Sequence, residues 1–183
     1  MLFEESTIII RSNRIFKNNE RIRFDENDIG EYVLAFAKDN EHLTEDLFIT
    51  EVDIDNFIRT KGAIYSGAAT LVESLGMDFD CVDKVYIAGG IGNHLNIENS
   101  VFIGLLPDID REKFQYIGNS SLIGSYLTLL SDEAKAKLEE IGEVMTYVEL
   151  SVYPTYMDEF ISCCFLPHTN IDAFPSVKAI LEG

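Results

Sequence analysis

The sequence predicts an α/β domain in which helices pack against a sheet, and two observations lead to this class. From residue 50 onward, segments with the three- and four-residue apolar spacing of helices alternate with short β-prone runs. Two of these runs, at 85–88 and 116–117, end in a glycine turn that precedes a further helix. Such alternation is typical of a layer of helices packed on a sheet.

Size and charge limit the class of protein. At 183 residues the chain can form one domain or two small lobes with a core. A net charge of −18 disfavours nucleic acid and anionic membrane surfaces as partners, because both need clustered Lys and Arg. We interpret the negative charge as a property of a solubilising surface. The alternative is that it forms an acidic face that docks a basic partner. Neither a membrane span nor a signal peptide is evident, so we expect a cytoplasmic protein.

The first 49 residues predict a β-rich meander. Runs at 7–10 and 14–17 lead to the turn-prone pair Asn18-Asn19, and alternation resumes at 21–24, which indicates a hairpin. Further strands are expected at 32–37 and 47–49. A soft boundary at 43–50 then divides the chain into a meander, 1–49, and an α/β part, 50–183.

The α/β part opens with a strong helix signal. Thr50 and Asp53 have the spacing of a capping box, and Gly76 lies where a C-terminal cap glycine belongs. Lys61 interrupts the apolar pattern, so it lies either on a solvated edge or aimed at a ligand. The later elements expected are helices at 98–105, 122–130, 132–141 and 157–161, and a strand at 144–150.

The stretch from 85 to 94 is the most informative part of the sequence. Its apolar run ends in Gly89 and Gly90, where no side chain separates the main chain from a ligand above the strand end. Ligands of open α/β sheets bind at the carboxyl ends of strands, so Gly118-Asn119 would complete the wall of a nucleotide cleft. The alternative is that these glycines only permit tight strand-to-helix turns. A P-loop is excluded, and Gly90-x-Gly92 lacks the third glycine of a dinucleotide fingerprint.

The other candidate groups predict no catalytic residue and no metal site. The histidines have no partners at ligand spacing, so we expect structural or surface roles for them: His42, His94 and His168. Three cysteines cannot form an even disulfide framework or ligate a four-thiolate cluster, so reduced thiols are expected: Cys81, Cys163 and Cys164. Adjacent cysteines in a strand would lie on opposite faces. Ser120-Ser121 are expected to cap a helix and Glu149 to form an ion pair.

Seven short motifs occur in an order that resembles a known family. They are Ile49-Thr50-x-x-Asp53-Ile54, Lys61-Gly62-Ala63-Ile64, Ala88-Gly89-Gly90-x-Gly92-Asn93, Ile103-Gly104-Leu105-Leu106-Pro107-Asp108, Gly118-Asn119-Ser120-Ser121-Leu122-x-Gly124, Glu149-Leu150-Ser151 and Phe165-Leu166-Pro167-His168. The series resembles the C-terminal part of the reductive activators of corrinoid proteins, which are iron–sulfur proteins with an actin-like ATPase domain. The match runs from about residue 31 to the C-terminus.

The resemblance implies a fold, an activity and partners. The fold would be the C-terminal lobe of an actin-like (ribonuclease H-like) ATPase domain, a mixed sheet with packed helices. The activators use ATP, with Mg²⁺, to return the Co(II) corrinoid of methyltransferase systems to Co(I). An N-terminal [2Fe–2S] domain supplies the electron, and the partner is a corrinoid protein. Whether the chain forms a homodimer is left open.

The resemblance also assigns residues to the nucleotide. The glycine pair would pack against the adenosine, the next two residues extend that loop, and a lysine on the preceding helix contacts the nucleoside. A second glycine loop would shape the same cleft. The assigned residues are Gly89, Gly90, Gly92, Asn93, Lys61, Gly118 and Asn119.

Two departures narrow these expectations. The chain has no four-cysteine cluster motif and no convincing Asp-x-Gly phosphate loop, so it would hold half of a nucleotide site and be inactive alone. The alternatives are an interaction module that docks a corrinoid protein, with purely structural glycines, and a fragment of an actin-fold small-molecule kinase.

Overall fold

The computed structural model describes residues 20–92 and 94–183, and the chain divides into two compact units, Met1–Arg59 and Thr60–Gly183. The described strands form one sheet in each unit. The boundary predicted near residue 50 stays a prediction, because compactness alone does not test independent folding.

In the first unit, three antiparallel strands form a sheet in the order β1-β2-β3. Their bounds are β1 Ile22–Phe24, β2 Gly30–Ala35 and β3 Leu47–Thr50. Tyr32 is paired with Ile22 on one side and with Ile49 on the other. These strands confirm those expected at 21–24, 32–37 and 47–49. The runs at 7–10 and 14–17, with the turn Asn18-Asn19, lie outside the described residues.

The long helix α1 (Glu51–Ser74) begins and ends as the sequence predicts. At its start, the Thr50 hydroxyl accepts a hydrogen bond from the Asp53 amide at 3.0 Å. The Asp53 carboxylate in turn accepts one from the Thr50 amide at 3.0 Å, which completes the capping box. After its end, Gly76 has φ +68° and donates to the Glu73 carbonyl at 2.8 Å.

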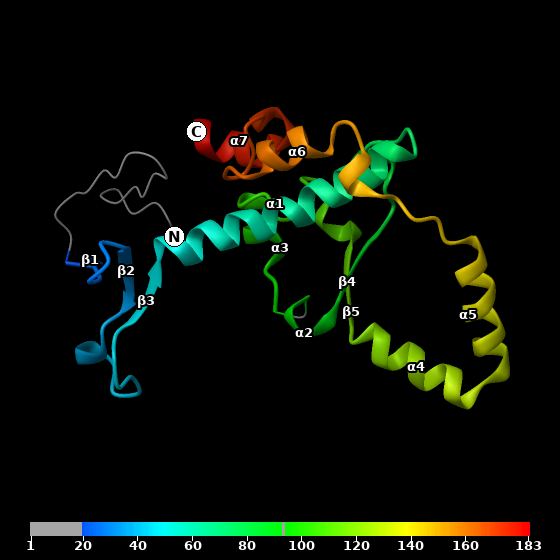
Figure 1. Cartoon of the computed structure of the whole chain (residues 1–183), viewed down its shortest axis with the longest axis horizontal. Helices are drawn as coiled ribbons and strands as arrows, with labels where there is room; N and C mark the ends of the chain where they lie inside the picture. The colour runs from blue at the N-terminus through cyan, green and yellow to red at the C-terminus, as the bar shows by residue number, and fades with distance from the viewer. Residues whose placement is uncertain (1–19, 93) are drawn as a thin grey trace. The chain divides into compact units, whose positions relative to one another are not determined.

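In the second unit, β4 (Val85–Ala88) and β5 (Phe114–Gly118) form a parallel pair. Parallel strands need a crossover connection, which here contains the helices α2 (Gly89–Gly92) and α3 (Ile97–Phe102). Figure 1 shows β4 and β5 side by side, with α2 following one strand and α4 the other. Helix α3 ends earlier than the expected residue 105, because the chain turns at Gly104 with φ +73°.

Helices α4 (Ser120–Leu130) and α5 (Asp132–Val144) meet at Ser131, which ends the first and caps the second (Figure 1). The Ser131 hydroxyl accepts from the Ala134 amide at 3.2 Å. The strand expected at 144–150 is wrong. Among the described residues, this segment pairs with no strand, and Val144, Met145 and Tyr147 are exposed. Within the described part of the chain, no helix is long and apolar enough to cross a membrane.

The last helices are α6 (Tyr156–Cys163) and α7 (Pro175–Glu182). Cys163 is the last residue of α6 and Cys164 is its C-cap, so the cysteine pair does not lie in a strand. Helix α7 was not expected, although a proline at the first helical position is a known start signal. The main core cluster lies between α1, α3, α6 and α7 and consists of Tyr65, Val101, Cys163, Phe174 and Val177. Short 3-10 turns complete the described elements: Ala37–Asp39, Phe79–Cys81, Arg111–Lys113, Leu150–Val152 and Ile171–Ala173.

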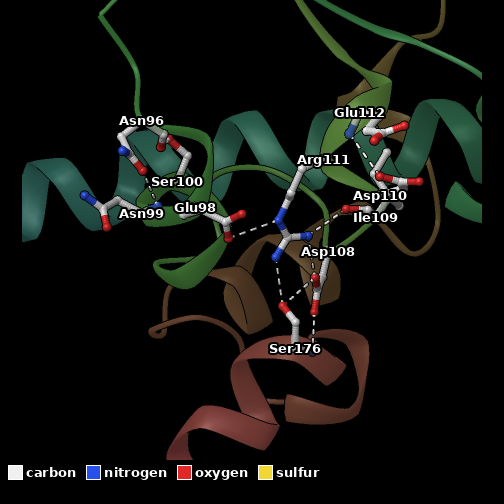
Figure 2. A network of polar contacts seen from close by, with 10 residues as sticks. All are labelled: Asn96, Glu98, Asn99, Ser100, Asp108, Ile109, Asp110, Arg111, Glu112 and Ser176. Atoms are coloured by element: carbon white, nitrogen blue, oxygen red, sulfur yellow. Dashed lines mark hydrogen bonds and ion pairs between the residues drawn. The ribbon is translucent and has the colours of Figure 1, made fainter.

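A polar network joins the segment before β5 to the start of α7 (Figure 2). The Asp108 side chain, only 3% exposed, lies 2.8 Å from the Arg111 guanidinium. It also accepts hydrogen bonds from the amide and the hydroxyl of Ser176, both at 2.7 Å. Burial alone would raise the pKa of Asp108, but the bonds from Arg111 and Ser176 outweigh it and the pKa is lowered.

Candidate functional site

The structure brings the two glycine turns together. Because β4 and β5 are parallel, their carboxyl ends lie at the same edge of the sheet. Ala88 is the register partner of Gly118, so the turn at Gly89-Gly90 lies beside the turn at Gly118-Asn119. Four of the seven residues assigned to the nucleotide therefore share one edge.

The space above these turns is open. A Cβ built at Gly89, Gly90 or Gly118 would meet no atom within 4 Å. Gly89 and Gly118 have φ values of +88° and +64°. This backbone conformation, rather than tight packing, is the reason for glycine at both positions. Gly90 has neither a positive φ nor a close neighbour, so the structure gives no local reason for its missing side chain.

Asn119 connects this edge to helix α4. Its side-chain oxygen accepts a hydrogen bond from the Leu122 amide at 3.0 Å, which makes Asn119 the N-cap of α4. Ser120 and Ser121, expected as caps, are instead the first helical residues. The positive end of the helix dipole therefore lies beside the glycine turns, an arrangement that favours electron-rich ligands.

The other two residues assigned in the first glycine loop are Gly92 and Asn93, and the surroundings of Gly92 are not open. Gly92 is buried, and a Cβ there would lie 2.7 Å from Cγ2 of Ile87. Packing against the core is therefore a sufficient reason for glycine at this position. Asn93 lies outside the described residues, so its contact with the nucleotide stays a prediction.

Lys61 is enclosed by the protein. The residue is 1% exposed, and its ammonium donates to the Pro167 carbonyl at 2.5 Å. Burial lowers the pKa of Lys61 to about 8. A solvated edge is therefore the wrong interpretation of this residue, and its predicted contact with the nucleoside stays a prediction.

Sequence reasoning missed a cluster of Glu159, Cys163 and His168. Their donor atoms all lie within 4.8 Å of one another. The signal that could have found it is the four-residue spacing of Glu159 and Cys163, which places both on one face of a helix. His168 joins them only through the fold.

Comparisons with known proteins identify relatives of this chain. A family model described as the C-terminal domain of RACo, the ASKHA domain, matches residues 2–178. A corrinoid activation enzyme, RamQ, from Eubacterium limosum is 32% identical in an alignment of 170 residues that covers 88% of this chain and 28% of the relative. A solved structure of a reductive activator for a corrinoid, iron–sulfur protein superposes with a TM-score of 0.79 at 50% identity. That match covers 87% of this chain and 25% of the activator. The chain thus spans about a quarter of the length of both proteins.

Proposed function

Because the chain belongs to the family of C-terminal ASKHA domains of such activators, we propose that its glycine turns form the adenosine side of an ATP site. The family match and the structural superposition confirm the family resemblance and the actin-like α/β class predicted from the sequence. The site would operate within a longer cytoplasmic activator whose partner is the corrinoid protein of a methyltransferase system.

The single observation that carries this proposal is the open edge formed by two adjacent glycine turns. At Gly90 the main chain is exposed and unobstructed. The face of a purine or ribose can therefore approach it more closely than it could approach any other residue at this position. At Asn119 the cap leaves the start of α4 beside the same edge. Flat, electron-rich groups such as an adenosine fit this arrangement.

The chain supplies part of the reaction. Reduction of Co(II) to Co(I) takes up one electron, which a [2Fe–2S] domain of the activator would donate. ATP binding would favour the arrangement in which this unfavourable transfer occurs. The β- and γ-phosphates and Mg²⁺ would be held by another part of the activator, so we expect no ATP turnover by this chain alone.

Substitution of Gly90 by leucine tests the site. A side chain there enters open space, so the fold should remain while the approach of the base is blocked. Gly142→Leu is the matched control, because a Cβ at Gly142 also meets no atom within 4 Å and lies on α5. ATP with Mg²⁺ is titrated into an activator that carries this domain. Its affinity should be at least tenfold weaker for Gly90→Leu than for the parent, and unchanged for Gly142→Leu. Equal affinities for the two variants would contradict the proposal.

The activity itself needs a second measurement. The same activator should restore the Co(I) absorbance of its corrinoid protein only when ATP and a reductant are present. Gly90→Leu should lower the rate of recovery in proportion to its lost ATP occupancy, whereas Gly142→Leu should not.

The exposed face of α4 favours a second candidate, a surface that docks the corrinoid protein. Helix α4 buries no residue, and six of its apolar side chains are at least half exposed: Leu122, Ile123, Tyr126, Leu127, Leu129 and Leu130. Exposed apolar groups in this number commonly mark an interaction surface. Loss of corrinoid-protein binding in Leu129→Glu with unchanged ATP affinity would favour docking, and the opposite result would favour the nucleotide site alone.

A further inference from the structure

The cluster of Glu159, Cys163 and His168 combines three kinds of metal ligand. Glu159 and Cys163 lie one turn apart on α6, and His168 follows that helix after a short loop. A carboxylate, a thiol and an imidazole are the ligand types that Zn²⁺ accepts in proteins. The cluster lies on α6 and the loop after it, whereas the glycine turns follow β4 and β5.

The spacing of the donor atoms suits a tetrahedral ion. Zinc bond lengths and tetrahedral angles require about 3.4 Å between oxygen and nitrogen ligands and about 3.6 Å between oxygen and sulfur. The Glu159 Oε1 atom lies 3.4 Å from Nε2 of His168 and 3.8 Å from Sγ of Cys163. The largest separation within the set is at most 4.8 Å, so an ion requires a shift of about 1 Å at one ligand.

His168 provides an independent indication. Its side chain is 6% exposed, and its ring packs near Tyr65 and Phe174, with centroid distances of 6.0 and 6.1 Å. Its Nε2 atom is buried, and among the described residues its 3.4 Å contact with Oε1 of Glu159 does not have hydrogen-bond geometry. Buried polar atoms are nearly always well satisfied, so this nitrogen beside a carboxylate and a thiol calls for an explanation.

Glu159 also lines a cavity of about 490 Å³. The described residues that line it include no lysine or arginine but four carboxylates: Glu73, Asp78, Asp158 and Glu159. A negative lining attracts cations and raises their local concentration.

We propose that Glu159, Cys163 and His168 form a binding site for one Zn²⁺ ion, with water from the cavity as the fourth ligand. The ion would connect α6 to the loop that leads to α7, and its role would be to stabilise the fold. The site does not depend on ATP or on a corrinoid partner.

Proton balance gives the site a characteristic signature. Coordination requires the Cys163 thiolate, so zinc must displace the thiol proton to solvent. The Asn170 amide donates to Nδ1 of His168 at 2.9 Å, which places the imidazole proton on Nε2. Coordination through Nε2 moves this proton to Nδ1 and breaks that bond. The lost bond lies at an exposed turn and costs about 1 kcal/mol, far less than zinc coordination contributes.

Titration of ZnCl₂ into the metal-free chain tests the proposal, with Cys81→Ser in every sample to remove the exposed thiol. We expect one Zn²⁺ per chain, the release of one proton, and transfer of the His168 ring proton from Nε2 to Nδ1 by nitrogen NMR. CoCl₂ should give the charge-transfer band of a cobalt–thiolate bond. Glu159→Gln, Cys163→Ser and His168→Gln should each weaken zinc binding at least about tenfold.

Two neighbours serve as matched controls. Asp158→Asn removes an adjacent carboxylate of the same cavity, and Cys164→Ser removes the adjacent thiol, so both should change the zinc affinity less than threefold. Circular dichroism identifies any variant that fails to fold. If Cys163→Ser fails to fold, Glu159→Gln still tests the proposal, because Glu159 is only half-buried. Absence of zinc uptake by the parent chain, or equal affinities in the cluster and control variants, would overturn the proposal. Zinc binding is measured without nucleotide, so this result stands apart from the ATP site.

Discussion

The ammonium of Lys61 donates a hydrogen bond to the carbonyl oxygen of Pro167, 106 residues further along the chain. This contact connects α1 to the loop between α6 and α7, so a residue of the second motif and one of the last motif meet in the core. Gly104 lies against the same contact, since a Cβ there would be 3.0 Å from the Lys61 Nζ atom and would collide with the Pro167 carbonyl.

Gly104→Ala should therefore lower the free energy of unfolding by about 2–5 kcal/mol. About 1–2 kcal/mol comes from the left-handed backbone, and overpacking adds about 1–3 kcal/mol. Gly76→Ala is the control, because Gly76 also has positive φ but a Cβ there meets nothing within 4 Å. Urea denaturation should give a loss of about 1–2 kcal/mol for this control, and equal losses would contradict the collision at Pro167.

The burial of Lys61 predicts a pH dependence. Its pKa is about 8 in the folded chain and near the ordinary lysine value of 10.5 when unfolded, so the unfolded chain binds more protons between these pH values. Stability relative to Lys61→Met should then rise with pH across this window, by up to about 3 kcal/mol. Denaturation of both proteins from pH 7 to 10.5 measures the difference, which also cancels most of the opposing effect of Cys163. A difference that stays flat would mean that the ammonium is not desolvated.

Two glycines of the same loop should respond differently to alanine. Gly92→Ala places a Cβ 2.7 Å from Ile87, a core residue, and should cost about 1–3 kcal/mol. Gly90→Ala enters open space and should change stability by less than about 1 kcal/mol. In a double-mutant cycle, Ile87→Leu, which removes the colliding Cγ2 atom, should recover part of the loss at Gly92. Additive effects would show that the two residues do not collide.

Loss of Asp108 should break the network at the start of α7. Asp108→Ala leaves the Ser176 amide and part of the Arg111 guanidinium without an acceptor, so we expect a loss of about 2–4 kcal/mol. Glu98→Ala, which removes an exposed partner of Arg111, should cost less than about 1 kcal/mol.

The lowered pKa of the Asp108 carboxyl predicts that stability depends on pH in the acid range. The pKa of Asp108 is lowered below 3.8, so its contribution is complete above that pH and is lost as the pH falls through the folded value. The stability difference between the parent chain and Asp108→Ala should therefore shrink below about pH 4. A difference that persists to pH 2 would place its origin in packing instead of charge.

Local signals in the sequence predicted the elements whose causes are local. The capping box of Thr50 and Asp53, the cap at Gly76 and the Ser131 cap of α5 all depend on residues within one helical turn. The strand expected at 144–150 failed because apolar alternation cannot tell whether a neighbouring strand is present to pair with. Helix α7 was missed because it is short and its packing partners are distant in sequence.

The sequence by itself determined the family, the helix caps and the two glycine turns, because motif order and backbone preferences are properties of the chain. Only the tertiary structure decided which residues meet. The parallel pairing of β4 and β5 set Gly89-Gly90 beside Gly118-Asn119. Folding also buried Lys61 against Pro167 and brought His168 to Glu159 and Cys163. Contacts of this kind depend on how separate elements pack, and neither spacing nor propensity along the chain contains that information.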